Sequence, residues 1–206
     1  MKGGPVMDGL ILAGGKSSRM GGEHKGALTL NKETFTGHVI KEMQKMADNI
    51  WISYGDKVHM EFDNVKVISD VHKNIGPIEG IYQGLLNCKS DMLLVSACDM
   101  PFVKKELYSF LLEKMYEAEE KSGEIYEGVV PTSGGRYHTL SAIYKKESAK
   151  YFKDSIDRHT YSIRSALDKM NMLYVPVDEI KEFHKMLENI NTKEEYMKFK
   201  NMDFTA

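Results

Sequence analysis

The stretch LAGGKSSRMGGEHK, residues 12–25, decides how this chain folds, because it joins an apolar strand to a glycine-rich loop. The residues Leu10-Ile11-Leu12 lead directly into Gly14-Gly15, where backbone N–H groups can approach a ligand without interference from a Cβ atom. Three basic side chains follow in the same stretch, those of Lys16, Arg19 and Lys25. The stretch therefore predicts a loop that binds phosphate at the end of a strand.

Two better-known phosphate motifs do not fit this loop. Gly15-Lys16-Ser17 matches the second half of a P-loop, but the first glycine of that motif would fall on Leu10. The dinucleotide pattern G-x-G-x-x-G fails because Gly14 and Gly15 are adjacent. The alternative without a ligand is a simple glycine turn whose charges face solvent.

Length, composition and charge favour one folded domain over residues 1–206. A hydrophobic fraction of 42% and a charged fraction of 28% are ordinary for a globular protein. The 28 basic and 30 acidic residues give a net charge of −2, which would attract neither nucleic acid nor an anionic membrane. No apolar run is long enough to span a bilayer, and the start MKGGPVMDGL lacks the apolar segment of a secretory signal. We therefore expect a cytoplasmic protein.

Cysteine usage excludes two further classes of protein. Cys88 and Cys98 are the only cysteines, and they do not form a C-x-x-C pair. A secreted disulfide framework or a structural zinc site is therefore not expected.

Short apolar runs alternate with longer amphipathic segments, which is typical of βαβ units and a parallel sheet. We expect the strands at about 7–12, 49–53, 65–69 and 92–97, and the helices at about 36–47, 78–87 and 103–119. The first strand ends in the glycine loop, the third in Asp70 and the fourth in Asp99. Because open α/β sheets bind ligands at the carboxyl ends of their strands, these three segments should meet in one crevice.

The second half of the chain has a less regular pattern. Strands are expected at 129–131 and 140–144, around the turn Ser133-Gly134-Gly135, followed by a helix at 161–170 and a strand at 173–177. Thr192 and Glu195 form a Thr-x-x-Glu capping box, which predicts the start of a last helix.

Two aspartates are candidates for the chemistry at the strand ends. Asp99 follows the apolar strand MLLVSAC and precedes Met100-Pro101, so it could bind Mg²⁺, which prefers one or two carboxylates together with phosphates and waters. Asp99 could instead cap the helix that begins near Val103. Asp70 could orient a ribose, a water or the metal, or it could be only a turn residue.

Basic side chains in the second half are candidates for holding an anionic substrate. His138 lies in GGRYHTLSAIY, where a histidine bonded to the backbone is the simpler interpretation, and Arg136 beside it could contact an anion. Arg158 and Arg164 could form a second anion site, although solvated helix charges are the commoner case.

Taken together, five segments resemble the molybdenum cofactor guanylyltransferases, the MobA family of nucleotidyltransferases. They are LAGGKSSRMGGEHKGAL at 12–28, SDVHKNIGPIEGIYQGL at 69–85, ACDMPF at 97–102, RYHTLSAIY at 136–144 and NINTKEEY at 189–196. The resemblance implies a Rossmann-like nucleotidyltransferase fold, with a mostly parallel sheet between two layers of helices. It also implies Mg²⁺-dependent transfer of GMP from GTP to molybdopterin carrying molybdenum, with release of pyrophosphate.

The resemblance also implies roles for individual residues. Leu12, Ala13, Gly14 and Asp70 would bind the nucleotide, Asp99 would bind GTP and magnesium, Lys25 would bind the phosphates, and Asn189 and Asn191 would face the pterin side. To these the residues themselves add Gly15 for the nucleotide and Arg19 for the phosphates. They also add His138, Arg136 and Arg164 as candidates for the acceptor side.

Three positions depart from the family pattern and leave the substrate open. His24 stands where Asp is usual, and Thr139 follows His138 where Pro is usual. Ser53 ends the second strand, where some members carry an Asn near the nucleotide. A cytidylyl- or sugar nucleotidyltransferase is one alternative, and a nucleotide-binding module without catalysis is another. Molybdoenzymes or cofactor chaperones are possible partners.

Overall fold

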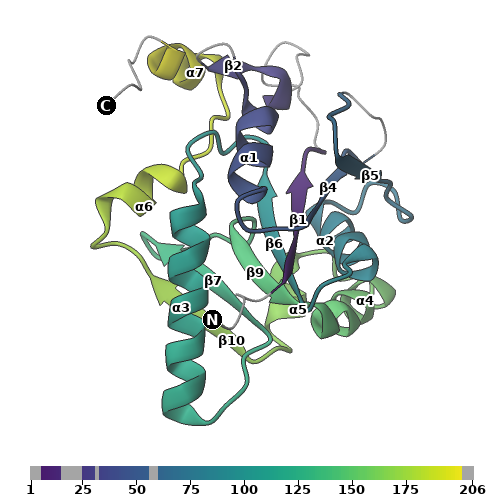
Figure 1. Ribbon diagram of the computed structural model, residues 1–206. Coiled ribbons are helices and arrows are strands. Elements are labelled where there is room, and N and C mark those ends of the chain that lie inside the picture. Colours follow the sequence, from purple (N-terminus) through teal and green to yellow (C-terminus); the bar gives the residue numbers. More distant parts are fainter. Residues whose placement is uncertain (1–5, 15–24, 31–32, 56–59, 201–206) are drawn as a thin grey trace.

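The computed structural model describes residues 6–14, 25–30, 33–55 and 60–200, which form one large sheet with helices on both faces (Figure 1). The strands run in the order β10-β7-β9-β6-β1-β4-β5, and β8 pairs with β7. A separate two-stranded sheet joins β2 (Thr29–Leu30) and β3 (Glu33–Thr34). The architecture is the three-layer α/β/α arrangement that the sequence predicts.

Four neighbouring parallel strands form the half of the sheet that carries the first motifs. They are β1 (Met7–Leu12), β4 (Asn49–Ser53), β5 (Val65–Ile68) and β6 (Met92–Ala97). Every residue of β1 and β6 is buried, as expected for parallel strands that are covered on both faces. The four strands that we predicted in this region are confirmed.

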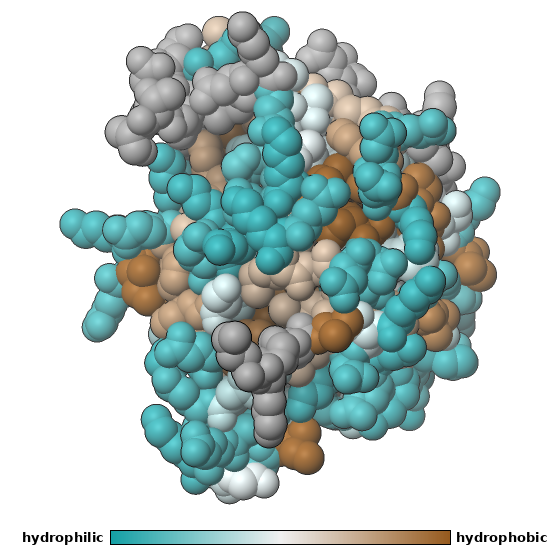
Figure 2. Space-filling view, viewed as in Figure 1, coloured by the Kyte–Doolittle hydropathy of each residue, from teal (hydrophilic) through white to brown (hydrophobic). Residues whose placement is uncertain are grey.

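Helices cover both faces of the sheet. On one face, α1 (Phe35–Met43), α3 (Lys105–Ser122) and α6 (Lys181–Met186) contribute to the core that contains Ile11 of β1, and the outer surface of α1 is hydrophilic (Figure 2). On the other face, α2 (Pro77–Asn87) packs on Leu10 and Leu12, and α4 (Ala149–Asp157) and α5 (Ile163–Leu167) contribute to the same core. Successive strand residues thus point to opposite cores, and each fully buried leucine or isoleucine contributes about 1.5–3 kcal/mol.

The remaining strands extend the sheet with both parallel and antiparallel pairings. They are β7 (Gly128–Ser133), β8 (Arg136–Tyr137), β9 (Ala142–Lys145) and β10 (Met172–Pro176). β9 runs antiparallel to both β6 and β7, and β7 forms a hairpin with β8 through Gly134 and Gly135, which have positive φ angles of 56° and 71°. The expected turn is confirmed, whereas β9 begins two residues later than predicted.

Helices of the second half differ more from the prediction. α5 occupies only the middle of the predicted helix 161–170, and the pattern did not predict α4, α6 or the short 3-10 helix η3 (Lys146–Ser148). α4 is anchored by few fully buried apolar side chains, such as Phe152 and Ile156, which give a narrow apolar stripe.

The last helix, α7 (Lys193–Lys200), begins at the predicted capping box. The Glu195 N–H donates to Thr192 Oγ1 at 3.1 Å, and the Thr192 N–H donates to Glu195 Oε2 at 3.0 Å. Hydrogen bonds to the Asn191 and Thr192 backbone outweigh the desolvation of Glu195 and lower its pKa. No helix within the described parts of the chain is long and apolar enough to cross a membrane.

Candidate active site

The carboxyl ends of β1, β4, β5 and β6 lie at one edge of the sheet, because the four strands are parallel neighbours (upper edge in Figure 1). Backbone hydrogen bonds continue past the strands into this edge. The Ala13 N–H donates to Ser53 O at 2.7 Å, and the Cys98 N–H donates to Leu12 O at 3.0 Å. The end of β1 is therefore held between the ends of β4 and β6.

Two glycines allow the loops after β1 and β4 to approach each other. A Cβ atom at Gly14 would lie 3.1 Å from the Tyr54 carbonyl oxygen. Gly55 has a φ of +74°, and its Cβ would lie 3.6 Å from Asp70 Oδ2 and 3.9 Å from the Gly14 Cα. The predicted residues Gly14 and Asp70 therefore meet at Gly55, which we had not predicted as a site residue.

Asp70 follows β5 and is fixed by a partner on the next strand. The buried Ser53 hydroxyl donates to Asp70 Oδ1 at 3.1 Å. This bond holds the carboxylate over the end of β4, beside the loop that contains Gly55. The sequence singled out Ser53 only as a departure from the family pattern and not as a site residue, although its position at the end of the predicted strand 49–53 could have indicated a role in the site.

Asp99 follows β6, is partly exposed and belongs to a firmly anchored segment. The Ile190 N–H donates to the Asp99 carbonyl at 2.9 Å, and His38 Nε2 lies 3.3 Å from the Val103 carbonyl. The N-cap of α3 is Lys104, which makes no side-chain capping bond, and Glu42 accepts the Lys105 N–H at 3.1 Å instead. The N-cap position of this helix is therefore Lys104 and not Asp99.

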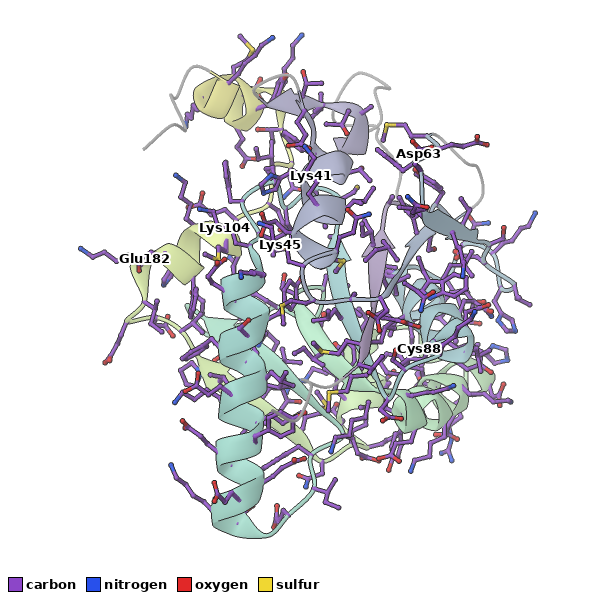
Figure 3. All side chains as sticks on the ribbon, in the orientation of Figure 1. Lys41, Lys45, Asp63, Cys88, Lys104 and Glu182 are labelled. Atoms are coloured by element: carbon purple, nitrogen blue, oxygen red, sulfur yellow. The ribbon has the colours of Figure 1, made fainter. Side chains whose placement is uncertain are left out.

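Glu42 accepts the Lys105 N–H in its ionised, carboxylate form. Burial raises the pKa of Glu42, but hydrogen bonds from Lys45 and from the Lys105 backbone outweigh it, so the pKa lies below its ordinary value. Figure 3 shows basic side chains around this junction, with Lys45 in the turn after α1 and Lys104 at the start of α3. The loop that carries Asp99 is thus tied to α1 by a charged contact.

Asn189 and Asn191 flank the residue that contacts the Asp99 backbone. Ile190 is fully buried against Phe102 and Phe35, and the Asn191 N–H donates to Glu195 Oε2 at 2.7 Å. The structure therefore brings the segment with both asparagines next to Asp99, although this segment and Asp99 are distant in sequence.

His138 lies at the same edge of the sheet. Val95 pairs with Ala142 in antiparallel register, which places the residues before Ala142 beside those that follow Val95. In agreement, Ser141 Oγ lies 3.0 Å from Met100 Sδ. Burial and the charges of Arg136 and His184 lower the pKa of His138, so its imidazole is more often neutral than an ordinary histidine.

A second histidine adjoins this region on a helix that the sequence did not predict. His184 of α6 has its Nε2 atom 3.1 Å from Ser133 Oγ and 3.8 Å from Asp178 Oδ1. The Gly134 N–H donates to the same Asp178 oxygen at 2.7 Å. These contacts join α6 to the β7–β8 turn beside His138.

Arg164 packs against β8. Its guanidinium lies 4.7 Å from the ring centroid of Tyr137, and its Nε lies 3.5 Å from Asp168. Arg158 pairs with Asp154 at 2.8 Å on α4. Arg164 therefore lies against Tyr137 of the hairpin that also carries Arg136, whereas Arg158 makes a local pair at the end of α4.

Part of the predicted glycine loop lies outside the described residues, namely Gly15, Lys16, Arg19 and the side chain of Lys25. The backbone of Lys25 begins the 3-10 helix η2 (Lys25–Ala27). This turn is tied to the start of α1, because Thr36 Oγ1 donates to the Gly26 carbonyl at 3.1 Å.

The donor atoms at this edge suit Mg²⁺ better than a metal that needs a complete protein cage. The described residues contain no group of three or more His, Cys, Asp or Glu side chains that could hold a metal ion. Mg²⁺ needs only one or two carboxylates when substrate phosphates and waters supply the other ligands. The partly exposed Asp99, at a strand end, can provide such a carboxylate.

Comparison with known proteins agrees with this geometry. A family model described as the MobA-like NTP transferase domain matches residues 9–173. Two relatives named as probable molybdenum cofactor guanylyltransferases come from Clostridium perfringens and Bacillus cereus. The first is 33% identical over 90% of this chain and 92% of its own length, and the second is 34% identical over 92% and 93%.

A solved structure of a related protein is similar to this chain in three dimensions. Molybdopterin-guanine dinucleotide biosynthesis protein A from Archaeoglobus fulgidus is 25% identical, with a TM-score of 0.74 over 94% of this chain and 96% of that one. The family model alone covers most of the sequence, including β1, β6 and the strand ends described above. The chain belongs to the MobA-like NTP transferase family.

Proposed function

We propose that this protein transfers GMP from GTP to molybdopterin carrying molybdenum, forming the guanine dinucleotide cofactor and pyrophosphate. The observation that carries the proposal is the meeting of Gly14, Gly55 and Asp70 beside β1, with Asp99 on the other side of that strand. The names of the relatives supply the identity of the two substrates.

On this proposal the nucleotide lies across the end of β1. The backbone of Leu12, Ala13 and Gly14 would contact it directly, and the missing Cβ of Gly14 lets the Tyr54 backbone pack against this turn. Asp70 would accept hydrogen bonds from the nucleoside, and the Ser53 hydroxyl would hold its carboxylate in place.

Asp99 would hold Mg²⁺ on the side of β1 that faces β6. When bound, Mg²⁺ neutralises phosphate charge and polarises the α-phosphate. The anchoring of the Asp99 backbone by Ile190 keeps its carboxylate at a fixed place relative to the nucleotide. Positioning of this kind is the main contribution of the protein to a nucleotidyl transfer.

Lys25 and Arg19 would stabilise the pyrophosphate as it leaves. An attacking phosphate oxygen of the acceptor displaces pyrophosphate from the α-phosphorus, so no covalent enzyme intermediate is needed. In the sequence these cations follow the first strand within the glycine-rich stretch, in which backbone N–H groups would add to the binding of phosphate.

The acceptor would approach from the side of β9 and α7. His138, Asn189 and Asn191 lie at the edge beside Asp99, and Arg136 and Arg164 extend this side along the β7–β8 hairpin. A neutral His138 can accept a hydrogen bond from a pterin N–H group as well as donate one. We place the reaction in the cytoplasm, with molybdoenzymes or cofactor chaperones as recipients of the product.

The test is pyrophosphate release measured with GTP and with CTP, each in the presence and absence of molybdopterin carrying molybdenum. We expect release only with GTP, the acceptor and Mg²⁺ together. Preference for CTP would indicate a cytidylyltransferase, and GTP binding without release under any condition would indicate a module without catalysis. Either result would overturn the proposal.

A further inference from the structure

Glu79 is a fully buried carboxylate in the first turn of α2, and its hydrogen bonds reach out of the helix. Its Oε1 accepts the backbone N–H groups of Val71 at 2.9 Å and His72 at 3.2 Å. Its Oε2 lies 3.0 Å from Nδ1 of the His72 ring. Glu79 thus holds the two residues that follow Asp70 directly in the chain.

Burial of such a group is costly unless its oxygen atoms are fully used. The Gln83 side-chain amide donates to Glu79 Oε1 at 2.9 Å, in addition to the two backbone N–H groups and the imidazole. A glutamate at this helix position would ordinarily reach back to the N-cap backbone and stay near solvent. The Glu79 side chain instead accepts hydrogen bonds from the loop after β5.

The same helix turn also touches the ends of β1 and β4. A Cβ atom at Gly80 would lie 2.5 Å from Leu12 Cδ2 and 3.1 Å from Ser53 Oγ. Ser53 is the residue that donates to Asp70. The first turn of α2 therefore contacts Leu12 and Ser53 through Gly80, and holds the loop after Asp70 through Glu79.

We propose that Glu79 is a positioning residue for the nucleotide site, acting through Asp70. By fixing the Val71 and His72 backbone, it keeps the Asp70 carboxylate within reach of the Ser53 hydroxyl and turned toward the end of β1. The inference rests on the proposed function for the identity of the nucleotide. The inference states that Glu79 controls the affinity of this chain for GTP without contacting the nucleotide.

Asp8 supplies a matched control, because it is also a fully buried carboxylate that accepts a backbone N–H. Its Oδ2 accepts the Lys89 N–H at 2.7 Å, and its Oδ1 accepts from Asn49 at 2.9 Å and Ser90 at 3.0 Å. Asp8 lies at the start of β1, at the opposite edge of the sheet. A purely structural role for Glu79 would make the two residues equivalent.

The experiment measures GTP affinity by calorimetry in the presence of Mg²⁺, together with the melting temperature, for the wild type, Glu79→Ala, Glu79→Gln and Asp8→Asn. We expect Glu79→Ala to weaken GTP binding about tenfold or more, the range typical of groups that orient a ligand-binding side chain. Glu79→Gln keeps one oxygen acceptor and should fall between the wild type and Glu79→Ala. Asp8→Asn should lower the melting temperature and leave GTP affinity unchanged.

A double-mutant cycle with Asp70→Asn tests whether Glu79 acts through Asp70. If it does, Glu79→Gln should weaken GTP binding several-fold in the wild type and barely at all in the Asp70→Asn background. Equal effects in both backgrounds, or wild-type affinity in both Glu79 variants, would overturn the inference. A wild-type protein that binds no GTP would instead contradict the proposed function, so the two failures are distinguishable.

Discussion

The two edges of the parallel half-sheet use similar residues in different ways. At the amino edge, the Asp8 carboxylate is enclosed by Asn49, Ser90 and the Lys89 N–H, and the neighbouring Cys88 lies buried at the lower end of β1 (Figure 3). At the carboxyl edge, glycines bring backbone segments together and leave Asp70 and Asp99 partly exposed. A carboxylate that the fold encloses stabilises the protein. A partly exposed carboxylate that its neighbours hold in place can bind a ligand.

The largest expected effect that separates the two edges is loss of catalysis in Asp99→Asn. We expect turnover to fall by about 10²–10³, the usual cost of removing a group that stabilises charge in the transition state. The melting temperature should stay near that of the wild type, because Asp99 is partly exposed. Pyrophosphate release at saturating Mg²⁺ and GTP measures the effect, and wild-type turnover would show that Asp99 does not carry the metal.

A smaller effect is expected from Gly55→Ala, with Gly123→Ala as its control. Both glycines have a positive φ, 74° and 72°, so alanine should destabilise the fold by about 1–2 kcal/mol at either position. Only at Gly55 would the new Cβ approach Asp70, since a Cβ at Gly123 meets nothing within 4 Å. We expect a several-fold rise in KM for GTP in Gly55→Ala alone, and equal KM values in both variants would refute the assigned role of Gly55.

At the amino edge, Asp8→Asn should change stability and not activity. The amide cannot accept all the hydrogen bonds that the carboxylate accepts, and an unsatisfied buried donor costs about 1–3 kcal/mol. Urea unfolding measures the loss, and kcat and KM for GTP serve as the control. A loss of turnover in this variant would remove the distinction between the two edges.

The smallest effect is a pH dependence of stability that Asp8 contributes. Burial raises the pKa of Asp8, but hydrogen bonds from Asn49, Lys89 and Ser90 outweigh it and bring the pKa below the ordinary value of 3.8. A depressed carboxyl pKa adds stability at pH values above 3.8, and this contribution is lost as the pH falls through the lower, folded-state value. Urea midpoints measured from pH 5 downward should therefore fall less steeply in Asp8→Asn than in the wild type.

The parallel half of the sheet could be predicted because its signals are local. β1 and β6 each contain a continuous apolar run, at residues 10–12 and 92–95, and a run of this kind needs cover on both faces whatever surrounds it. The capping box of Thr192 and Glu195 is equally local, since both partners lie within one helical turn. Asp70 and Asp99 could be selected because each follows such a strand.

The features that escaped prediction depend on contacts between distant residues. The bond between Ser53 and Asp70 spans 17 positions, and the Asp99 carbonyl is bound by Ile190 from a distant segment. α6 is only six residues long, too short for a clear periodic pattern. Sequence periodicity thus predicts strands and their ends, whereas the partners that orient the site become visible only after the chain is folded.

Hydrogen–deuterium exchange, with and without GTP and Mg²⁺, tests the central claim most directly. If the carboxyl edge binds the nucleotide, exchange should slow in residues 12–14, 54–55, 70–72 and 98–100. Exchange in residues 88–91, which surround Asp8 at the amino edge, should stay unchanged. Slower exchange at 88–91 with no change at the four strand ends would contradict the account.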